Sequence, residues 1–339
     1  MKTTNRNLSV SLYTLLCAVT LHGLTFTGFA QTTNQVLSLD GSGAYVSIPS
    51  APDLQNPIET TVEAWIFPTI TAGNQFGSFI NKGDGLSALS ARTYEWRWFS
   101  NGRISVSFFL DHVDGTPDAG GAPSVVLTAN TWTHLAATFD SGQGIMRFYT
   151  NGVLTEETSS LNGTPIAGRR LRQSTLPVVL GYTPSFGNTY ASGGMDEVRI
   201  WTIARTAEDI YATAFCRLTG TETNLAGYWN FDDGTANDLT GHGHNGTFVG
   251  NAQALPITGI DVVHANCGVP LLDGISLTSD HQPLITLSGR TGLFYRVDVS
   301  SNLVDWLPWV TLSNSSGTMQ LIDPGAPRYP RRFYRAVSQ

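Results

Sequence analysis

The sequence predicts an all-β protein built on an antiparallel β-sandwich, and three observations support this fold class. Only 13% of the 339 residues are charged, whereas 35 are glycine and 10% are aromatic. Eight glutamates and two lysines are too few to form many exposed helix faces. Short segments of alternating apolar and polar residues, separated by turn residues, fill most of the chain. Because no long helical crossovers intervene, we expect two stacked antiparallel sheets.

The expected elements follow this alternation along the chain. A first strand ends at the turn Asp40–Gly43, and a second ends at Pro49. Further strands are expected at residues 61–67, 77–81, 94–99, 104–110, 132–140, 145–150, 178–182 and 195–202. The pairs Asn-Gly at 101–102 and 151–152 predict hairpin turns. One short helix is expected at residues 206–215, because Thr206 can cap its first turn.

The first 30 residues have the pattern of a signal peptide. Lys2 and Arg6 precede an apolar run, and Ala30 is the small residue before a cleavage point at Gln31. Lipidation of Cys17 is the alternative, but a leucine precedes it where such a motif has a small residue. No later stretch has the ~20 apolar residues of a membrane span. We therefore expect a secreted or cell-surface protein with no transmembrane segment.

The charge distribution excludes nucleic acid as a partner. The formal net charge is −7, and residues 31–269 hold 11 basic and 21 acidic residues. Residues 270–339 hold six basic and five acidic residues. Neither part offers the cationic stripe that phosphate neutralisation requires.

Two cysteines remain after the predicted cleavage, Cys216 and Cys267. In an oxidising compartment this pair has one intramolecular connectivity, so we expect a disulfide. It would close a loop of about 50 residues and stabilise the fold by about 4 kcal/mol. The alternative is two buried free thiols.

Several stretches resemble a known family, the laminin-G-like, concanavalin A-like lectin/glucanase jelly rolls. Residues 132–140 contain its W-x-H-x-A strand, and residues 194–201 with the helix after Thr206 resemble its closing signature. The other similar stretches are residues 39–46, 62–66 and 148–152. The resemblance implies a jelly roll over residues 31–215. It specifies the fold more than the function, since the same fold is used by lectins, adhesion modules and glycosidases.

The remaining sequence divides into two parts. Residues 216–269 resemble the segment that often trails such jelly rolls, and we expect them to add a strand or two to the sandwich. Beyond Pro270 the sequence resembles a small β module found in many exported bacterial proteins. A separate short β-sandwich is expected over residues 270–339.

The family resemblance also implies a structural calcium ion. Laminin-G-like jelly rolls often hold Ca²⁺ between the first-strand loop and the closing strand, which places it here on Asp40, the Gly43 carbonyl and Asp196. Carboxylate and carbonyl oxygens are the ligands that Ca²⁺ prefers. The alternative is that Asp40 closes a turn and Asp196 accepts hydrogen bonds from loop amides.

Carbohydrate binding is predicted at two places, because sugars stack on aromatic faces and bind polar groups through their hydroxyls. Tyr94, Trp96 and Trp98 fall on one side of an alternating strand and would form a platform if that side were exposed. The commoner alternative is that they are core, which leaves Glu95 and Arg97 towards solvent. Loops at the rim of a sandwich often bind ligands, and the candidate contact residues in the loops at 111–123 and 183–193 are Asp111, His112, Asp114, Asp118, Asn188 and Tyr190.

The sequence offers no catalytic residues. Glycosidases of this superfamily use two glutamates at close spacing on one strand. Glu156 and Glu157 are adjacent and would point to opposite faces, while Glu63 and Glu197 stand alone and are expected to form ion pairs or hydrogen bonds. His134 is expected to be a hydrogen-bonded structural residue.

His242 and His244 could project the same way from an extended segment, as a zinc pair does. The sequence places no third or fourth ligand, however, and the family resemblance makes this stretch a glycine-rich loop.

The sequence therefore predicts an exported, non-catalytic protein that binds a polysaccharide or glycan through a calcium-stabilised jelly roll. The alternative is protein–protein adhesion or a structural role at the surface, with a surface protein as partner. A third reading is a glycoside hydrolase whose site the sequence does not reveal.

Overall fold

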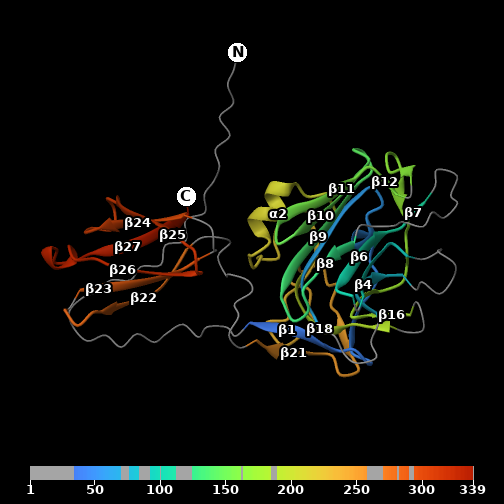
Figure 1. Ribbon diagram of the computed structural model, residues 1–339, viewed down its shortest axis with the longest axis horizontal. Helices are drawn as coiled ribbons and strands as arrows, with labels where there is room; N and C mark the ends of the chain where they lie inside the picture. The colour runs from blue at the N-terminus through green and yellow to red at the C-terminus, as the bar shows by residue number, and fades with distance from the viewer. Residues whose placement is uncertain are drawn as a thin grey trace, which may run out of the picture. The chain divides into compact units, whose positions relative to one another are not determined.

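Among the residues that the structure describes, almost all regular secondary structure is β-strand, divided between two units, so the predicted fold class is confirmed (Figure 1). The computed structural model describes residues 34–69, 76–83, 92–99, 101–111, 124–161, 163–184, 189–257, 270–280, 282–289 and 294–338. One unit is Ala30–Val263, and the other contains His264–Gln339. This division falls within the undescribed residues 258–269, so the predicted boundary at 270 stays a prediction, as does the leader peptide.

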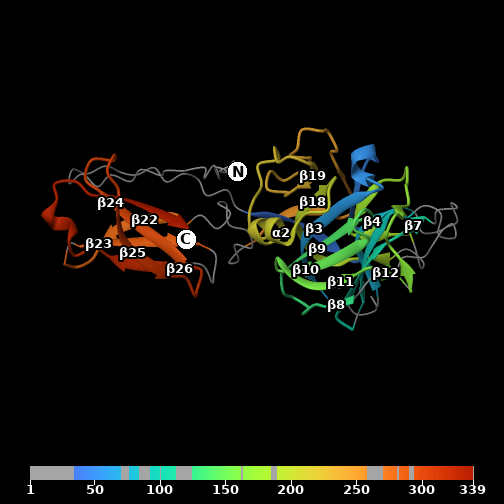
Figure 2. The ribbon, with the colours of Figure 1, turned by 90° about the horizontal axis from the view of Figure 1, so that it is seen from above.

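Two antiparallel sheets, here called sheet A and sheet B, form the two layers of the N-terminal unit (Figure 2). Sheet A runs in the order β11 (Val153–Thr158), β10 (Ile145–Thr150), β9 (Thr133–Asp140), β3 (Glu59–Pro68), β18 (Ser192–Trp201), β1 (Gln35–Asp40) and β21 (Gln253–Pro256), with β19 (Leu225–Trp229) also paired to β18. Sheet B runs in the order β20 (Thr247–Val249), β2 (Tyr45–Ile48), β15 (Val178–Leu180), β4 (Phe76–Lys82), β5 (Tyr94–Phe99), β6 (Arg103–Phe108) and β8 (Ser124–Val126).

Short elements connect these strands. Three small two-stranded sheets are β7 (Leu110–Asp111) with β14 (Arg170–Leu171), and the hairpins β12 (Ser160–Leu161) with β13 (Thr164–Pro165) and β16 (Tyr182–Thr183) with β17 (Thr189–Tyr190). The 3-10 helix η1 (Pro52–Gln55) follows β2. Helix α2 (Ala207–Thr213) begins as predicted, because the Thr206 hydroxyl accepts a hydrogen bond from the Asp209 amide at 3.1 Å.

The alternation of side chains places the core between the two sheets. In β3, Val62, Ala64 and Ile66 point into this core, where they join apolar residues of sheet B such as Trp96 and Phe108. The outer face of the central strands of sheet A is also buried. Helix α2 packs there through Ile210 against Ala136 and Tyr149, and Phe215 contacts Trp65. Strands β3 and β9 are therefore buried on both faces, so their polar side chains need internal partners.

The segment after residue 216 is an integral part of the sandwich. β19 pairs with β18, β20 extends sheet B beside β2, and β21 extends sheet A beside β1. The sequence suggested one or two added strands, whereas the structure has three.

The C-terminal unit consists of two three-stranded antiparallel sheets. One orders β22 (Leu271–Leu277), β23 (Pro283–Ser288) and β26 (Thr318–Ile322); the other orders β25 (Leu307–Ser313), β24 (Phe294–Ser300) and β27 (Phe333–Ser338). Its own core includes Ile285, Leu287, Val297 and Tyr334, and η2 (Ala326–Arg328) precedes β27. Within the described ranges of both units, no helix is long and apolar enough to cross a bilayer.

Candidate functional site

Asp40 closes a tight turn at the end of β1. Its Oδ1 accepts hydrogen bonds from the amides of Ser42 (2.8 Å) and Ala44 (3.0 Å), and its Oδ2 accepts one from Asn251 (3.0 Å). Partial burial raises the pKa of this carboxyl, but these hydrogen bonds outweigh it and lower the pKa to about 2. The Gly43 carbonyl oxygen faces Gly250, whose Cβ, if present, would lie 2.3 Å from it. Asp40 therefore serves the turn, as in the alternative weighed against calcium.

Asp196 lies elsewhere, so the predicted calcium ligand set is wrong. Asp40 pairs with Ser192, and Asp196 lies four residues further along β18, which is about 13 Å at the rise of a strand. The Asp196 carboxylate is fully buried and accepts hydrogen bonds from Asn34 (3.2 Å) and the Glu197 amide (2.8 Å). Burial and the neighbouring Glu197 charge raise its pKa well above the ordinary value. One ion cannot bind both carboxylates, and calcium binding as such stays a prediction.

A buried network of charges occupies the outer face of sheet A. Glu63 accepts hydrogen bonds from Arg205 (2.9 Å) and Trp201 (2.8 Å), and His134 Nε2 lies 3.4 Å from it. Burial alone would raise the pKa of Glu63, but His134, Arg199 and Arg205 lower it below the ordinary range. Burial also lowers the pKa of His134.

The same network includes the second isolated glutamate. Glu197 pairs with Arg199 and accepts a hydrogen bond from Tyr228 (2.8 Å). Both glutamates thus form the ion pairs expected of them, and His134 belongs to the same structural network. Every charged member is sequestered beneath α2 and the segment after residue 216, so this cluster supports the fold.

The aromatic strand β5 is not a sugar platform. Tyr94, Trp96 and Trp98 are 1%, 0% and 4% exposed and lie in the core between the sheets. The alternative weighed for these three residues is therefore correct. Glu95 points the other way but is also buried, and its Oε2 accepts hydrogen bonds from Arg92 (3.3 Å) and Arg97 (2.6 Å). The expectation that Glu95 would face solvent is wrong.

The rim-loop residues are only partly described. His112, Asp114, Asp118 and Asn188 lie outside the described residues. Asp111 is half-exposed and accepts a hydrogen bond from Arg172 Nε (3.2 Å). Tyr190 is half-buried in β17.

Tyr190 belongs to a cluster of three tyrosines that the sequence did not reveal. Its ring stacks on Tyr182 with centroids 4.6 Å apart, and the Tyr45 ring lies 5.1 Å from Tyr182 and 6.5 Å from Tyr190. All three are half-buried. Burial, followed by the neighbouring tyrosines, raises the pKa of Tyr182. The cluster begins directly after the Asp40 turn, because Ala44, whose amide donates to Asp40, precedes Tyr45.

Cys216 is buried, and its thiol donates to the Ala212 carbonyl at 3.0 Å. Its predicted partner Cys267 lies outside the described residues. The disulfide therefore stays a prediction.

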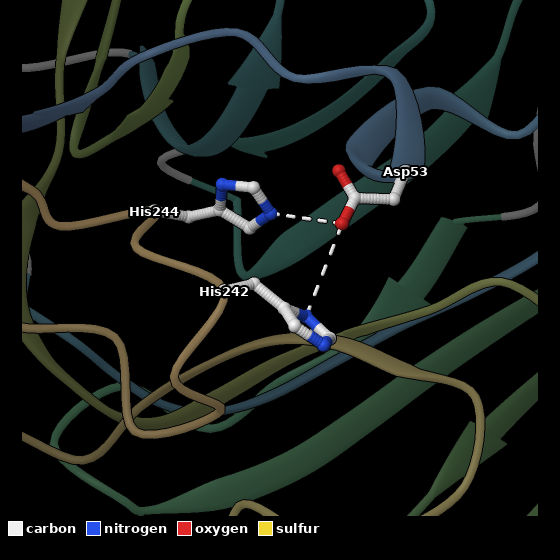
Figure 3. A group of neighbouring side chains, drawn as sticks. All are labelled: Asp53, His242 and His244. Atoms are coloured by element: carbon white, nitrogen blue, oxygen red, sulfur yellow. Dashed lines mark hydrogen bonds and ion pairs between the residues drawn. The ribbon is translucent and has the colours of Figure 1, made fainter.

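The two histidines of the loop between β19 and β20 meet an aspartate from η1 (Figure 3). His244 Nε2 lies 2.9 Å from Asp53 Oδ2, and His242 Nδ1 lies 3.9 Å from the same oxygen. His242 Nδ1 is also 3.0 Å from the Ala226 carbonyl. Both rings thus project the same way, as the sequence suggested. Asp53 was missed because about 190 residues separate it from them and nothing in its local sequence marks it.

Comparisons with known proteins agree with this architecture. No curated protein matches the sequence. A candidate carbohydrate-binding protein from Bacteroides ovatus ATCC 8483 has a similar structure, with a TM-score of 0.50 and 18% identity over 67% of this chain. The match covers 61% of that protein, so the chain spans less than two thirds of its length. The module called CBM40 of the Ruminococcus gnavus IT-sialidase, bound to α2,3-sialyllactose, has a TM-score of 0.41 and 14% identity, covering 53% of this chain and 96% of that one.

The family comparison is more specific. The sequence profile of the concanavalin A-like lectin/glucanases superfamily, Laminin_G_3, matches residues 40–211. That range includes β2, β3, β9 and β18, the strands on which the sequence resemblance rested. The predicted resemblance is confirmed: the chain belongs to the concanavalin A-like lectin/glucanases superfamily.

Proposed function

We propose that this protein is an exported, non-catalytic module that binds a polysaccharide or glycan. The observation that carries the proposal is the cluster of Tyr45, Tyr182 and Tyr190 at the rim of the sandwich. The three rings pack against one another with centroids 4.6 to 6.5 Å apart and are half-buried, so the cluster offers a partly exposed aromatic surface. Such a surface can stack on the C–H face of a pyranose ring, and the phenol hydroxyls can bond to sugar hydroxyls.

Two further points support carbohydrate over other ligands. The superfamily to which the chain belongs includes lectins and glucanases. The Bacteroides ovatus protein of similar fold is itself described as a candidate carbohydrate-binding protein. Polar side chains for binding sugar hydroxyls lie at the turn that directly precedes Tyr45. There Asn251 donates a hydrogen bond to Asp40 (3.0 Å).

The proposal is tested by screening the mature protein on a glycan array and against insoluble polysaccharides. Tyr190→Ala should reduce binding by about 5- to 150-fold, if its ring contributes the ~1–3 kcal/mol that an aromatic side chain contributes when a planar ring such as a nucleobase stacks on it. Tyr211→Ala is the matched control, because Tyr211 is a 43% exposed tyrosine on α2. Thermal melts of both variants show whether the fold is intact.

Other outcomes would favour the alternatives. Failure to bind any glycan, together with specific capture of a surface protein, favours adhesion. New reducing ends after incubation with polysaccharides favour a hydrolase. The presence of the protein in the culture medium tests export, and repeating the binding and the melt after chelation tests calcium.

A further inference from the structure

We propose that Asp53, His242 and His244 form a binding site for a Zn²⁺ ion. The triad brings together one carboxylate and two imidazoles whose ligand atoms all lie within 4.8 Å of one another. η1 supplies the carboxylate, and the loop between β19 and β20 supplies both rings (Figure 3). The site thus links the start of the chain's sandwich to its trailing segment.

The spacing of the three donors suits a tetrahedral ion. Zinc bonds of about 2.0–2.1 Å at tetrahedral angles separate two ligand atoms by about 3.4 Å. The observed separations from Asp53 Oδ2 are 2.9 Å to His244 and 3.9 Å to His242, one on either side of this value. Small rotations of the side chains, in which His242 Nδ1 leaves the Ala226 carbonyl, would therefore place all three donors around one ion. Three protein ligands leave a fourth position for water or another ligand.

The donor types select the metal. Imidazole nitrogens combined with a carboxylate oxygen suit Zn²⁺ and neighbouring transition metals. Ca²⁺ and Mg²⁺ instead require a shell made of oxygens. This site is therefore distinct in kind from the calcium site that the family resemblance implied.

The loop that carries the histidines is fixed before any metal binds. Asp238 accepts hydrogen bonds from the amides of Tyr228 (3.2 Å), Thr240 (3.0 Å) and His244 (3.1 Å). The Trp229 indole donates to the His244 carbonyl at 3.0 Å. Hydrogen bonds that hold a ligand-bearing loop in place orient the metal ligands and reduce the free-energy cost of assembling the metal site.

The site is accessible to ions from solvent. The side chains of His242 and Asp53 are 50% and 37% exposed, whereas that of His244 is 12% exposed. The competing explanation is a simple Asp53–His244 pair, in which His242 only contacts the Ala226 carbonyl. That explanation predicts no role for His242, so this residue decides between the two.

The experiment titrates Zn²⁺ into the untagged, metal-free protein by calorimetry and records the visible spectrum with Co²⁺ as a geometric probe. We expect one ion per chain, a tetrahedral Co²⁺ spectrum and a higher melting temperature with zinc. His242→Ala and Asp53→Asn should each weaken zinc binding by about 100-fold. Removing a residue that only hydrogen-bonds to a metal ligand can already cost that much, and these two residues are proposed as ligands themselves. His281→Ala, which removes a histidine from the C-terminal unit, is the matched control and should bind zinc normally.

Two results would overturn the proposal. One is the absence of stoichiometric zinc binding by the wild-type protein. The other is a His242→Ala variant that binds zinc as tightly as the wild type. Melts without metal verify that each variant is folded, and the half-exposed Asp53 and His242 are chosen because their replacement leaves the core intact.

Discussion

Lys82 provides a direct test of the packing at one end of the N-terminal core. Its side chain is fully buried at the end of β4, where Nζ donates to Ser50 Oγ (3.0 Å) and to the Leu176 carbonyl (2.9 Å). Within the described ranges, no carboxylate forms an ion pair with it. Neutral acceptors compensate only part of the desolvation of an ammonium group. Burial accordingly lowers the pKa of Lys82 from 10.5 to about 8.

This lowering makes the contribution of Lys82 to stability depend on pH. A pKa lowered by about 2.5 corresponds to about 3 kcal/mol between the charged and neutral forms. The unfolded chain holds the proton more tightly than the folded protein, so stability rises with pH between about 8 and 10.5. Lys82→Met removes this dependence. The free energy of unfolding of the wild type should therefore gain about 3 kcal/mol relative to Lys82→Met from pH ~7 to pH ~10.5.

The assay is urea unfolding followed by tryptophan fluorescence at several pH values across this range. Comparison with Lys82→Met cancels the titration of the other groups and the pH-independent loss of two hydrogen bonds. Lys82→Arg is the control, because a guanidinium keeps its proton throughout, and its difference from Lys82→Met should stay constant. A wild-type difference from Lys82→Met that is equally constant would refute the reasoning.

Further predictions concern other parts of the chain. Glu63→Gln should lower the free energy of unfolding by about 3–5 kcal/mol because it removes the counter-charge from buried arginines. In the wild type the stabilisation by the Glu63 carboxylate should be present above pH ~4.5 and be lost on further acidification, because the pKa of Glu63 is lowered in the folded protein. Denaturant titrations of both proteins at several pH values measure this difference. Gly193→Ala should cost several kcal/mol, since the new Cβ would lie 1.9 Å from the Phe67 carbonyl oxygen at a φ of +132°; wild-type-like melting would contradict this. Asp323→Asn should weaken the bonds from Arg332 and Tyr334 and lower only the calorimetric transition of the C-terminal unit. Mass spectrometry of a non-reduced digest should show the peptides of Cys216 and Cys267 linked; two free thiols would contradict it.

The fold was predictable because local alternation determines strands. β5 and β10 have the predicted limits, and α2 begins after the predicted cap. Alternation also placed Tyr94, Trp96 and Trp98 on one side of β5. It could not decide which side is buried, because that depends on the neighbouring sheet.

The predicted calcium ligand set is wrong because the sequence does not reveal the register between β1 and β18. Asp40 and Asp196 lie on neighbouring strands, as the family resemblance implied, but their positions along those strands differ by four residues. A single sequence contains no signal for this offset, since the pairing of β1 with β18 is set by long-range packing.

The charged residues of sheet A show a second limit. Glu63, His134 and Arg199 alternate with core residues, which is the pattern of a solvated face. The sequence indicated that Glu63 would be paired and His134 hydrogen-bonded, but it gave no sign that their face is covered. The cover comes from α2 and the residues directly after it, whose Ala214 and Cys216 carbonyls accept hydrogen bonds from Trp65 and Arg199, and these residues are remote from β3 in the sequence. Burial converts ordinary surface ion pairs into contacts whose disruption is costly.

The trailing segment contributes to both candidate sites, although the three tyrosines themselves lie within residues 31–215. β20 pairs with β2 and places Val249 opposite Tyr45 of the tyrosine cluster. The loop before β20 carries His242 and His244 to Asp53. The superfamily match ends at residue 211, before either contribution. A chain truncated at residue 215 would expose the edge of β2 and lose both imidazoles of the proposed zinc site.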